Sequence, residues 1–322
     1  MSISLKLKRA INVYLKEYLC LTEDESILII SDTKRQELSF NFFEMTNKIT
    51  QDSFYLEIGN LYNDPLKLPN IFYEAAKAVD TILFVADMPI MGSPILRKIS
   101  DLGVRVAVLP LISEDALSRC MITKADELLD IAKNFELRLQ NAENIRIETK
   151  SGTNLTLPVK DREIFLNTGI LKKIGETGYI PSGKIYLSPI DEMSYGTLIV
   201  DCYIQGIGLL KSPVKIEIEN GMAVKIYTDS DDGRNFQKII NQYGEDARNI
   251  AEFGLGINPK SLVSSDFYET ESSFGTCFVA FGGNVALGGK IDVPARISCI
   301  IQNPSIFVDD KFLLNNGKFV NK

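Results

Sequence analysis

Histidine, the side chain that most often carries acid–base and metal chemistry, is absent from all 322 residues of this sequence. Without an imidazole the chain cannot form a Ser-His-Asp triad, a Cys-His dyad or a His-ligated zinc site. It also lacks any side chain whose ordinary pKa lies close to neutrality. The missing histidine therefore excludes a large share of the hydrolytic mechanisms and of the zinc sites known in proteins.

Cysteine is the next candidate for chemistry, but the spacing of the cysteines in the sequence does not indicate a metal or redox site. The sequence contains no CxxC pair, so neither a zinc ribbon nor a thioredoxin-like dithiol is expected. An odd number of scattered cysteines is typical of a reducing compartment. We expect most of them to be small buried residues; they are Cys20, Cys120, Cys202, Cys277 and Cys299.

Two glycine-rich segments look like phosphate-binding loops. GYIPSGK (178–184) matches GxxxxGK, but Ile185 replaces the Ser or Thr that would hold magnesium, and a strand follows where a helix is needed. FGGNVALGGK (281–290) lacks the helix as well. No GxGxxG follows the first strand, so a dinucleotide site is not expected either. Both segments are interpreted as tight turns between strands.

Length and charge place these residues in an ordinary globular chain of about two domains. The sequence has 35 Lys+Arg against 42 Asp+Glu, a net charge of −7, which argues against a nucleic-acid partner. No apolar stretch reaches the roughly 18–20 residues of a membrane span. The first residues lack the apolar core of a signal peptide. We therefore expect a cytoplasmic protein with neither nucleic acid nor membrane as a partner.

Residues 1–143 are predicted to form an α/β domain with a parallel sheet. Four short runs rich in β-branched and aromatic residues are typical of buried parallel strands, and helical patterns lie between them. The strands are expected at 26–31, 53–58, 81–86 and 104–109. The helices are expected at 3–19, 35–49, 70–79, 94–101 and about 124–142.

Residues 144–322 are predicted to form a β-rich α+β domain. Alternating apolar segments are separated by turn signals, of which Asn220-Gly221 is the strongest because both residues tolerate positive φ. A helical pattern over 232–253 interrupts the strands. Further strands are expected at 276–282, 296–302 and 305–309.

Three segments of this second domain occur in a recognisable order and spacing. They are AEFGLGINPK (251–260), ETESSFGTCFVAFGGNVALGG (269–289) and PARISCIIQNPSIFVDDKFLLNNGKFV (294–320). IRIETKSGTNLTLPVKDR (145–162) and GYIPSGKIYLSPIDEMSYGTLIVD (178–201) agree with them. Together these motifs resemble those of the aminopeptidase T family of metallo-aminopeptidases and its leucyl-aminopeptidase-like relatives. The resemblance implies their two-domain fold, a homodimer and a cleft in the C-terminal domain.

The same resemblance implies six metal-ligand positions, and most of them are changed. Two carboxylates are kept, at Glu252 and Glu271, whereas the other four positions hold residues of another kind. Those four are Lys184, Phe278, Arg296 and Ser298. Divalent metals need carboxylate or imidazole lone pairs, which these four residues do not offer. Lys184 and Arg296 are instead expected to neutralise the two carboxylates, with Lys184 and Glu252 as a candidate ion pair. We expect no metal and no other cofactor.

Two functions are consistent with such a dismantled centre. The first is a metal-free, aminopeptidase-like pseudoenzyme that binds a peptide or amino-acid-like ligand in the former cleft, or that scaffolds a partner. The alternative is a metal-independent enzyme of a specialised peptide-tailoring or natural-product pathway, with Lys184 and Glu252 as acid–base groups. In either case a homodimer is expected, and a heteromer with a paralogue is kept as a variant.

The ligand-binding residues expected from this interpretation are the six changed or kept ligand positions together with one motif asparagine. Each also has a purely structural explanation. Arg296 could clamp a carboxylate or phosphate, or lie at the rim of the site. Phe278 would fill the space of a lost ligand. The full set is Lys184, Glu252, Glu271, Arg296, Ser298, Phe278 and Asn258.

Overall fold

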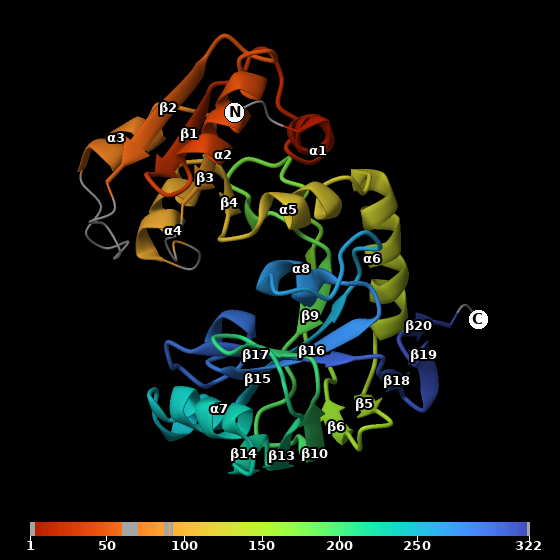
Figure 1. Ribbon diagram of the computed structural model, residues 1–322. Coiled ribbons are helices and arrows are strands. Elements are labelled where there is room, and N and C mark those ends of the chain that lie inside the picture. The colour runs from red at the N-terminus through yellow and green to blue at the C-terminus, as the bar shows by residue number, and fades with distance from the viewer. Residues whose placement is uncertain (1–3, 60–69, 87–89, 91–92, 321–322) are drawn as a thin grey trace. The chain divides into compact units, whose positions relative to one another are not determined.

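The chain forms two compact units, each of which takes two segments of the sequence (Figure 1). The computed structural model describes residues 4–59, 70–86, 90 and 93–320. Unit 1 comprises residues 1–127 and 167–182, and unit 2 comprises 128–166 and 183–322. The chain therefore leaves unit 1, enters unit 2, returns and leaves again. The division at residue 143 stays a prediction.

Unit 1 is built on a five-stranded parallel sheet with the strand order β2-β1-β3-β4-β8. All four predicted strands are present, and β1, β3 and β4 are buried along their whole length, as continuous apolar runs require. The fifth strand comes from the returning segment and was not predicted. The strands are β1 (Ile27–Asp32), β2 (Ser53–Ile58), β3 (Thr81–Val85), β4 (Arg105–Leu109) and β8 (Thr177–Tyr179).

Helices connect these strands, as the alternating pattern predicts. Several begin at a serine whose side chain accepts a hydrogen bond from the first turn; Ser4, Ser93 and Ser113 do so. The predicted helix over 3–19 is an α-helix that passes into a π-helical turn at Tyr14–Tyr18, and residue 3 lies outside the described residues. The helices are α1 (Leu5–Val13), α2 (Gln36–Thr46), α3 (Asn70–Lys77), α4 (Pro94–Asp101), α5 (Glu114–Cys120), which was not predicted, and α6 (Ala125–Leu139), most of which belongs to unit 2.

A buried arginine joins distant segments of unit 1. Arg105 Nη1 donates to the carbonyl oxygens of Leu19 (2.8 Å) and Leu171 (3.0 Å). Its Nη2 donates to Thr81 Oγ1 (2.8 Å) and pairs with Glu25. Because Leu171 belongs to the returning segment, this one guanidinium links three stretches that are far apart in the sequence.

Unit 2 contains two sheets that are mostly antiparallel, and Figure 1 shows them as separate layers. The eight-stranded sheet has the order β14-β13-β10-β6-β5-β18-β19-β20. Its β13–β14 hairpin turns at Asn220-Gly221, which confirms that prediction. The strands are β5 (Asn144–Glu148), β6 (Asn154–Pro158), β10 (Tyr195–Val200), β13 (Val214–Glu219), β14 (Met222–Ile226), β18 (Ser305–Val308), β19 (Lys311–Asn315) and β20 (Lys318–Phe319).

The seven-stranded sheet has the order β12-β11-β17-β16-β15-β9-β7. Its central strands β15, β16 and β17 are almost completely buried. Short helix α8 (Phe267–Ser272) packs against β15 and β16 (Figure 1). The strands are β7 (Phe165–Asn167), β9 (Lys184–Leu187), β11 (Tyr203–Ile204), β12 (Gly208–Leu209), β15 (Ile250–Gly256), β16 (Thr276–Gly282) and β17 (Arg296–Gln302).

The helix predicted over 232–253 is too long. Helix α7 spans only Asp231–Asn241, a 3₁₀ turn follows at Glu245–Arg248, and β15 begins at Ile250. Gly244 adopts φ +85° between α7 and the turn, a conformation that a continuing helix does not allow. Together the two units confirm the predicted fold class, an α/β domain with a parallel sheet and a β-rich α+β domain.

Among the described residues, no helix is long and apolar enough to cross a membrane.

Replacing Arg105 with methionine is expected to destabilise unit 1. R105M removes the cation that pairs with Glu25 and leaves two main-chain oxygens without their donor, so we expect a loss of about 3 kcal/mol in the free energy of unfolding. Urea titration measures it. The control is R97M on the exposed side of α4, for which we expect less than about 0.5 kcal/mol. Equal stabilities of the two variants would contradict the assigned role of Arg105.

Candidate active site

Four charged side chains meet on one face of the seven-stranded sheet. Lys184 begins β9, Glu252 lies in β15, Arg296 begins β17, and Glu271 comes from α8 above the sheet. The preceding loop holds α8 in place, because Ser264 Oγ donates to Glu269 Oε2 (2.7 Å). The structure thus brings together four of the residues singled out from the sequence.

The four side chains form a continuous chain of ion pairs. Arg296 Nε and Nη2 donate to Glu252 Oε2 (2.8 Å) and Oε1 (3.1 Å), a two-pronged contact that fixes the guanidinium plane. Arg296 Nη2 also donates to Glu271 Oε1 (2.9 Å), and Lys184 Nζ donates to Glu271 Oε2 (2.6 Å). Lys184 therefore pairs with Glu271, not with Glu252 as the sequence suggested.

Burial and charge together keep Glu271 ionised. Its side chain is only 2% exposed, and burial alone would raise the pKa of the carboxyl. Arg296 and Lys184 outweigh that effect and lower the pKa of Glu271 to about 2. Two cations and two carboxylates balance, so the cluster carries no formal net charge.

Aromatic rings lie against the two cations. Lys184 Nζ and Arg296 Cζ are each 5.5 Å from the centre of the Phe278 ring, within the range of cation–π attraction. Lys184 Nζ is also 5.7 Å from the Tyr186 ring, which stacks on Phe165. Burial, followed by the charge of Glu252, raises the pKa of Tyr186 to about 12, so its phenol stays protonated at neutral pH.

The position of Phe278 depends on the glycine opposite it. Gly254 on β15 pairs with Phe278 on β16, and a Cβ atom at Gly254 would lie 2.2 Å from Phe278 Cζ. The ring therefore occupies the space over Gly254. Tyr186 and Phe165 were missed in the sequence, although Tyr186 follows Lys184 by two residues and must share its face of the strand.

The other predicted residues lie around this charged cluster. Ser298 is buried on β17, two residues after Arg296. Asn258 is buried in the turn after β15, where its Oδ1 accepts a hydrogen bond from Lys260 N (3.0 Å). Cys277 and Cys299 are fully buried, and burial raises the pKa of both thiols. Their thiols are therefore poor nucleophiles at neutral pH.

The donor set of the cluster does not fit a divalent metal ion. Both carboxylates are already hydrogen-bonded to cations, and the residues at the other implied ligand positions bring either positive charge or no anionic oxygen. Across the described ranges, no three His, Cys, Asp or Glu side chains are grouped so that they could hold a metal.

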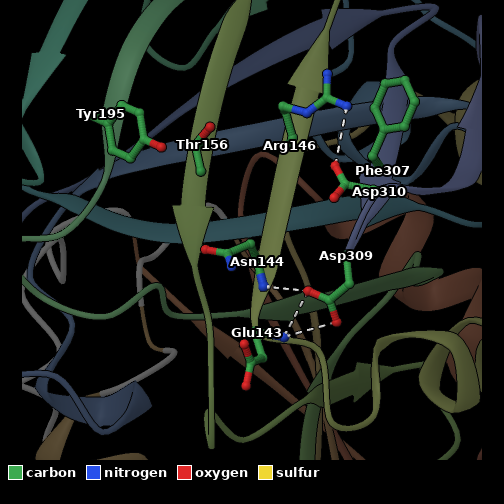
Figure 2. A pocket seen from close by; sticks show the side chains of 8 residues that line it. All are labelled: Glu143, Asn144, Arg146, Thr156, Tyr195, Phe307, Asp309 and Asp310. Atoms are coloured by element: carbon green, nitrogen blue, oxygen red, sulfur yellow. Dashed lines mark hydrogen bonds and ion pairs between the residues drawn. The ribbon is translucent and has the colours of Figure 1, made fainter.

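A separate hollow of about 560 Å³ lies on the eight-stranded sheet (Figure 2). Phe307, Arg146, Thr156 and Tyr195 form a row across four neighbouring strands. Arg146 lies over the Phe307 ring at 4.0 Å, and Asp309 accepts hydrogen bonds from two main-chain nitrogens. None of the residues predicted for a site lines this hollow.

Comparison with solved structures first establishes the fold. The chain is similar to wild-type AmpT from Thermus thermophilus, with a TM-score of 0.69 and 13% identity over 98% of this chain and 99% of that one. It is also similar to 2,5-dihydroxypyridine dioxygenase from Pseudomonas putida KT2440, with a TM-score of 0.85 and 18% identity over 100% of this chain and 99% of that one. The molecule therefore has the aminopeptidase T type of fold.

The sequence comparisons identify the family. The model of NicX, 2,5-dihydroxypyridine 5,6-dioxygenase, matches residues 20–321, and the chain belongs to this family. A curated relative, 2,5-dihydroxypyridine 5,6-dioxygenase from Pseudomonas putida, is 22% identical over 261 residues, which cover 76% of this chain and 73% of that protein.

These findings correct the function expected from the sequence. The resemblance to aminopeptidase T was right for the fold, but the family is named for an oxygenase, so the peptide-binding, metal-free pseudoenzyme was wrong. The alternative acid–base pair is not supported either, because Glu252 bonds to Arg296 while Lys184 bonds to Glu271. The motifs suggested the wrong function because their glycines are required by the close packing of the sheet and not by a reaction. A Cβ atom at Gly256, for example, would lie 2.1 Å from Ser273 O.

Replacing Glu271 with glutamine should remove a pH-dependent part of stability. The folded pKa of about 2 lies below the ordinary value of 4.5. Its contribution is therefore present above pH 4.5 and lost as the pH falls toward 2. We expect about 3 kcal/mol of the difference in unfolding free energy between wild type and E271Q to disappear over that range.

Urea titrations at several pH values from 7 to 2 measure this difference. The control is E148Q, because Glu148 forms a half-exposed pair with Arg146 and should contribute less than about 1 kcal/mol. A difference between wild type and E271Q that does not change with pH would contradict the ionised state of Glu271.

Proposed function

We propose that the chain is an enzyme that takes a hydroxylated pyridine ring as its substrate and adds both atoms of dioxygen to it, as its family name states. The observation that carries the proposal is the family match over residues 20–321. The similarity in fold to a 2,5-dihydroxypyridine dioxygenase, which extends over the whole chain, supports it. The homodimer and the cytoplasmic location expected from the sequence stay predictions.

We place the substrate at the charged cluster because donors remain free there. Arg296 uses Nε and Nη2 for the carboxylates, and Nη1 forms no hydrogen bond within the described part of the chain. The side chain of Arg296 is 34% exposed, so Nη1 can be reached. Lys184 makes one hydrogen bond among the same residues, which leaves two of its three ammonium hydrogens.

The chemistry of these groups suits a dihydroxypyridine. Such a ring is planar and carries two oxygens that accept hydrogen bonds. Because the two cations and two carboxylates of the cluster already neutralise one another, an uncharged ring can bind beside them without leaving any charge unpaired. The buried Phe278 ring packs against both cations and so helps to fix their positions. The chain's own residues thus bind and orient the ring, whereas Glu271, with a pKa of about 2, is too weak a base to take its proton.

The proposal is tested by measuring binding and turnover separately. Calorimetry with 2,5-dihydroxypyridine should show binding to the wild-type chain. Oxygen uptake should match the loss of substrate mole for mole, in assays run with and without added Fe²⁺ or Mn²⁺. If the ring binds but no assay shows oxygen uptake, the proposed reaction is wrong. If the ring does not bind, the proposed substrate is wrong.

Arg296→Lys tests the place of binding. R296K keeps the positive charge beside Glu252 and Glu271 but loses the planar fork and the free Nη1. We expect affinity for 2,5-dihydroxypyridine to fall about 10- to 100-fold, as for the loss of hydrogen bonds from a charged donor. The control is R146K, which alters an arginine that also lies over a ring but belongs to the other sheet. Equal affinities of the two variants would refute the placement.

A further inference from the structure

Ser298 carries a hydroxyl that has no partner. The residue is completely buried, and its Oγ forms no hydrogen bond with any described residue. Leaving a buried hydroxyl unpaired costs about 1–3 kcal/mol, and most buried polar atoms in native proteins are paired. The Ser298 hydroxyl is therefore available to a partner other than the described residues.

The register of the sheet places this hydroxyl beside the charged cluster. Ser298 on β17 is opposite Ala280 on β16, which is opposite Glu252 on β15. Directly opposite residues share a face of a sheet, and so do residues two apart along a strand. Ser298 thus lies on the same face as Glu252 and Arg296, and only the methyl group of Ala280 stands between it and Glu252.

The Phe278 ring lies on the same face of the sheet. Phe278 pairs with Ile300, two residues after Ser298 on the same strand. Arg296 and Ser298 are themselves about 7 Å apart along the strand. The two oxygens of a 2,5-dihydroxypyridine lie on opposite carbons of its ring, so each end of the molecule needs a donor of its own.

The surroundings of Ser298 are fixed. Its main-chain nitrogen donates to Gln205 Oε1 (3.2 Å), and its carbonyl oxygen accepts from Gln205 N (2.9 Å). These bonds hold the strand at this point, so a ligand that reaches the buried hydroxyl must displace the side chains that cover it and not the strand itself. Among the buried unpaired side-chain atoms of the described residues, Ser194 Oγ provides a contrast, because Ser194 directly precedes β10 of the other sheet.

We propose that Ser298 is a substrate-binding residue that determines specificity: its Oγ–H donates to one ring oxygen of a dihydroxypyridine, while Arg296 Nη1 donates to the other. This inference rests on the proposed function and adds to it a rule for substrate choice. The site would select rings with oxygens on opposite carbons over rings that carry a single oxygen.

The test compares three ligands with two variants by calorimetry. The ligands are 2,5-dihydroxypyridine and the two rings that each lack one of its oxygens, 2-hydroxypyridine and 3-hydroxypyridine. S298A should bind 2,5-dihydroxypyridine about 3- to 10-fold more weakly, the usual effect of one uncharged hydrogen bond. It should bind one of the two single-oxygen rings as tightly as wild type does. S194A, which removes the other unpaired hydroxyl, should bind all three as wild type does.

The outcomes separate this inference from the proposed function. Wild-type affinity of S298A for all three ligands would overturn the inference and assign the hydroxyl to a water. An equal loss of affinity for all three ligands would also overturn the inference, because the Ser298 hydroxyl would then not contact one particular oxygen of the ring. Failure of the wild-type chain to bind any of the rings would overturn the proposed function and the inference together. S298A removes an unpaired group, so its thermal unfolding should be no lower than that of wild type.

Discussion

The arrangement of the seven-stranded sheet depends on one buried carboxylate. Glu271 is held away from water, where an unpaired charge would cost several kcal/mol. Its two partners come from different strands, Lys184 from β9 and Arg296 from β17, and Arg296 reaches Glu252 in β15, one of the two strands between them. The registry of three strands and the position of α8 must all be right for the four charges to be satisfied. A slip of one residue in any strand would turn its charged side chain to the opposite face.

The sequence was a good guide to elements whose signal is local. Four apolar runs form four of the five strands of unit 1, and Asn220 and Gly221 adopt the positive φ values that their hairpin needs. It failed where a segment takes its structure from its neighbours. The segment IAEFGLG is buried on both faces, so it shows no alternation, and its first four residues were included in the helix predicted over 232–253. The three residues of β8 are too few to give any periodic pattern, and they form a strand only because β4 offers them an edge.

The candidate site shows the same division between local and long-range information. A resemblance of motifs located Lys184, Glu252, Glu271 and Arg296, which do meet in space. It assigned the wrong partner to Lys184, because the pairing depends on α8 lying above the sheet, and the order of residues along the chain does not reveal that. It also identified the wrong family, since the glycines that made the motif recognisable report how closely strands and turns approach. One fold can host different reactions, so packing of this kind does not identify the reaction.

The return of the chain to unit 1 has a consequence for biosynthesis. Strand β8 and the Leu171 carbonyl that Arg105 binds are translated only after β5, β6 and β7. Until then β4 is an open edge, and its unpaired main-chain groups can join another strand. Unit 1 therefore cannot finish folding before residue 182 has been made, after the first segment of unit 2. A nascent chain halted between residues 127 and 167 would expose that edge, so cotranslational folding of this protein depends on uninterrupted passage through the first part of unit 2.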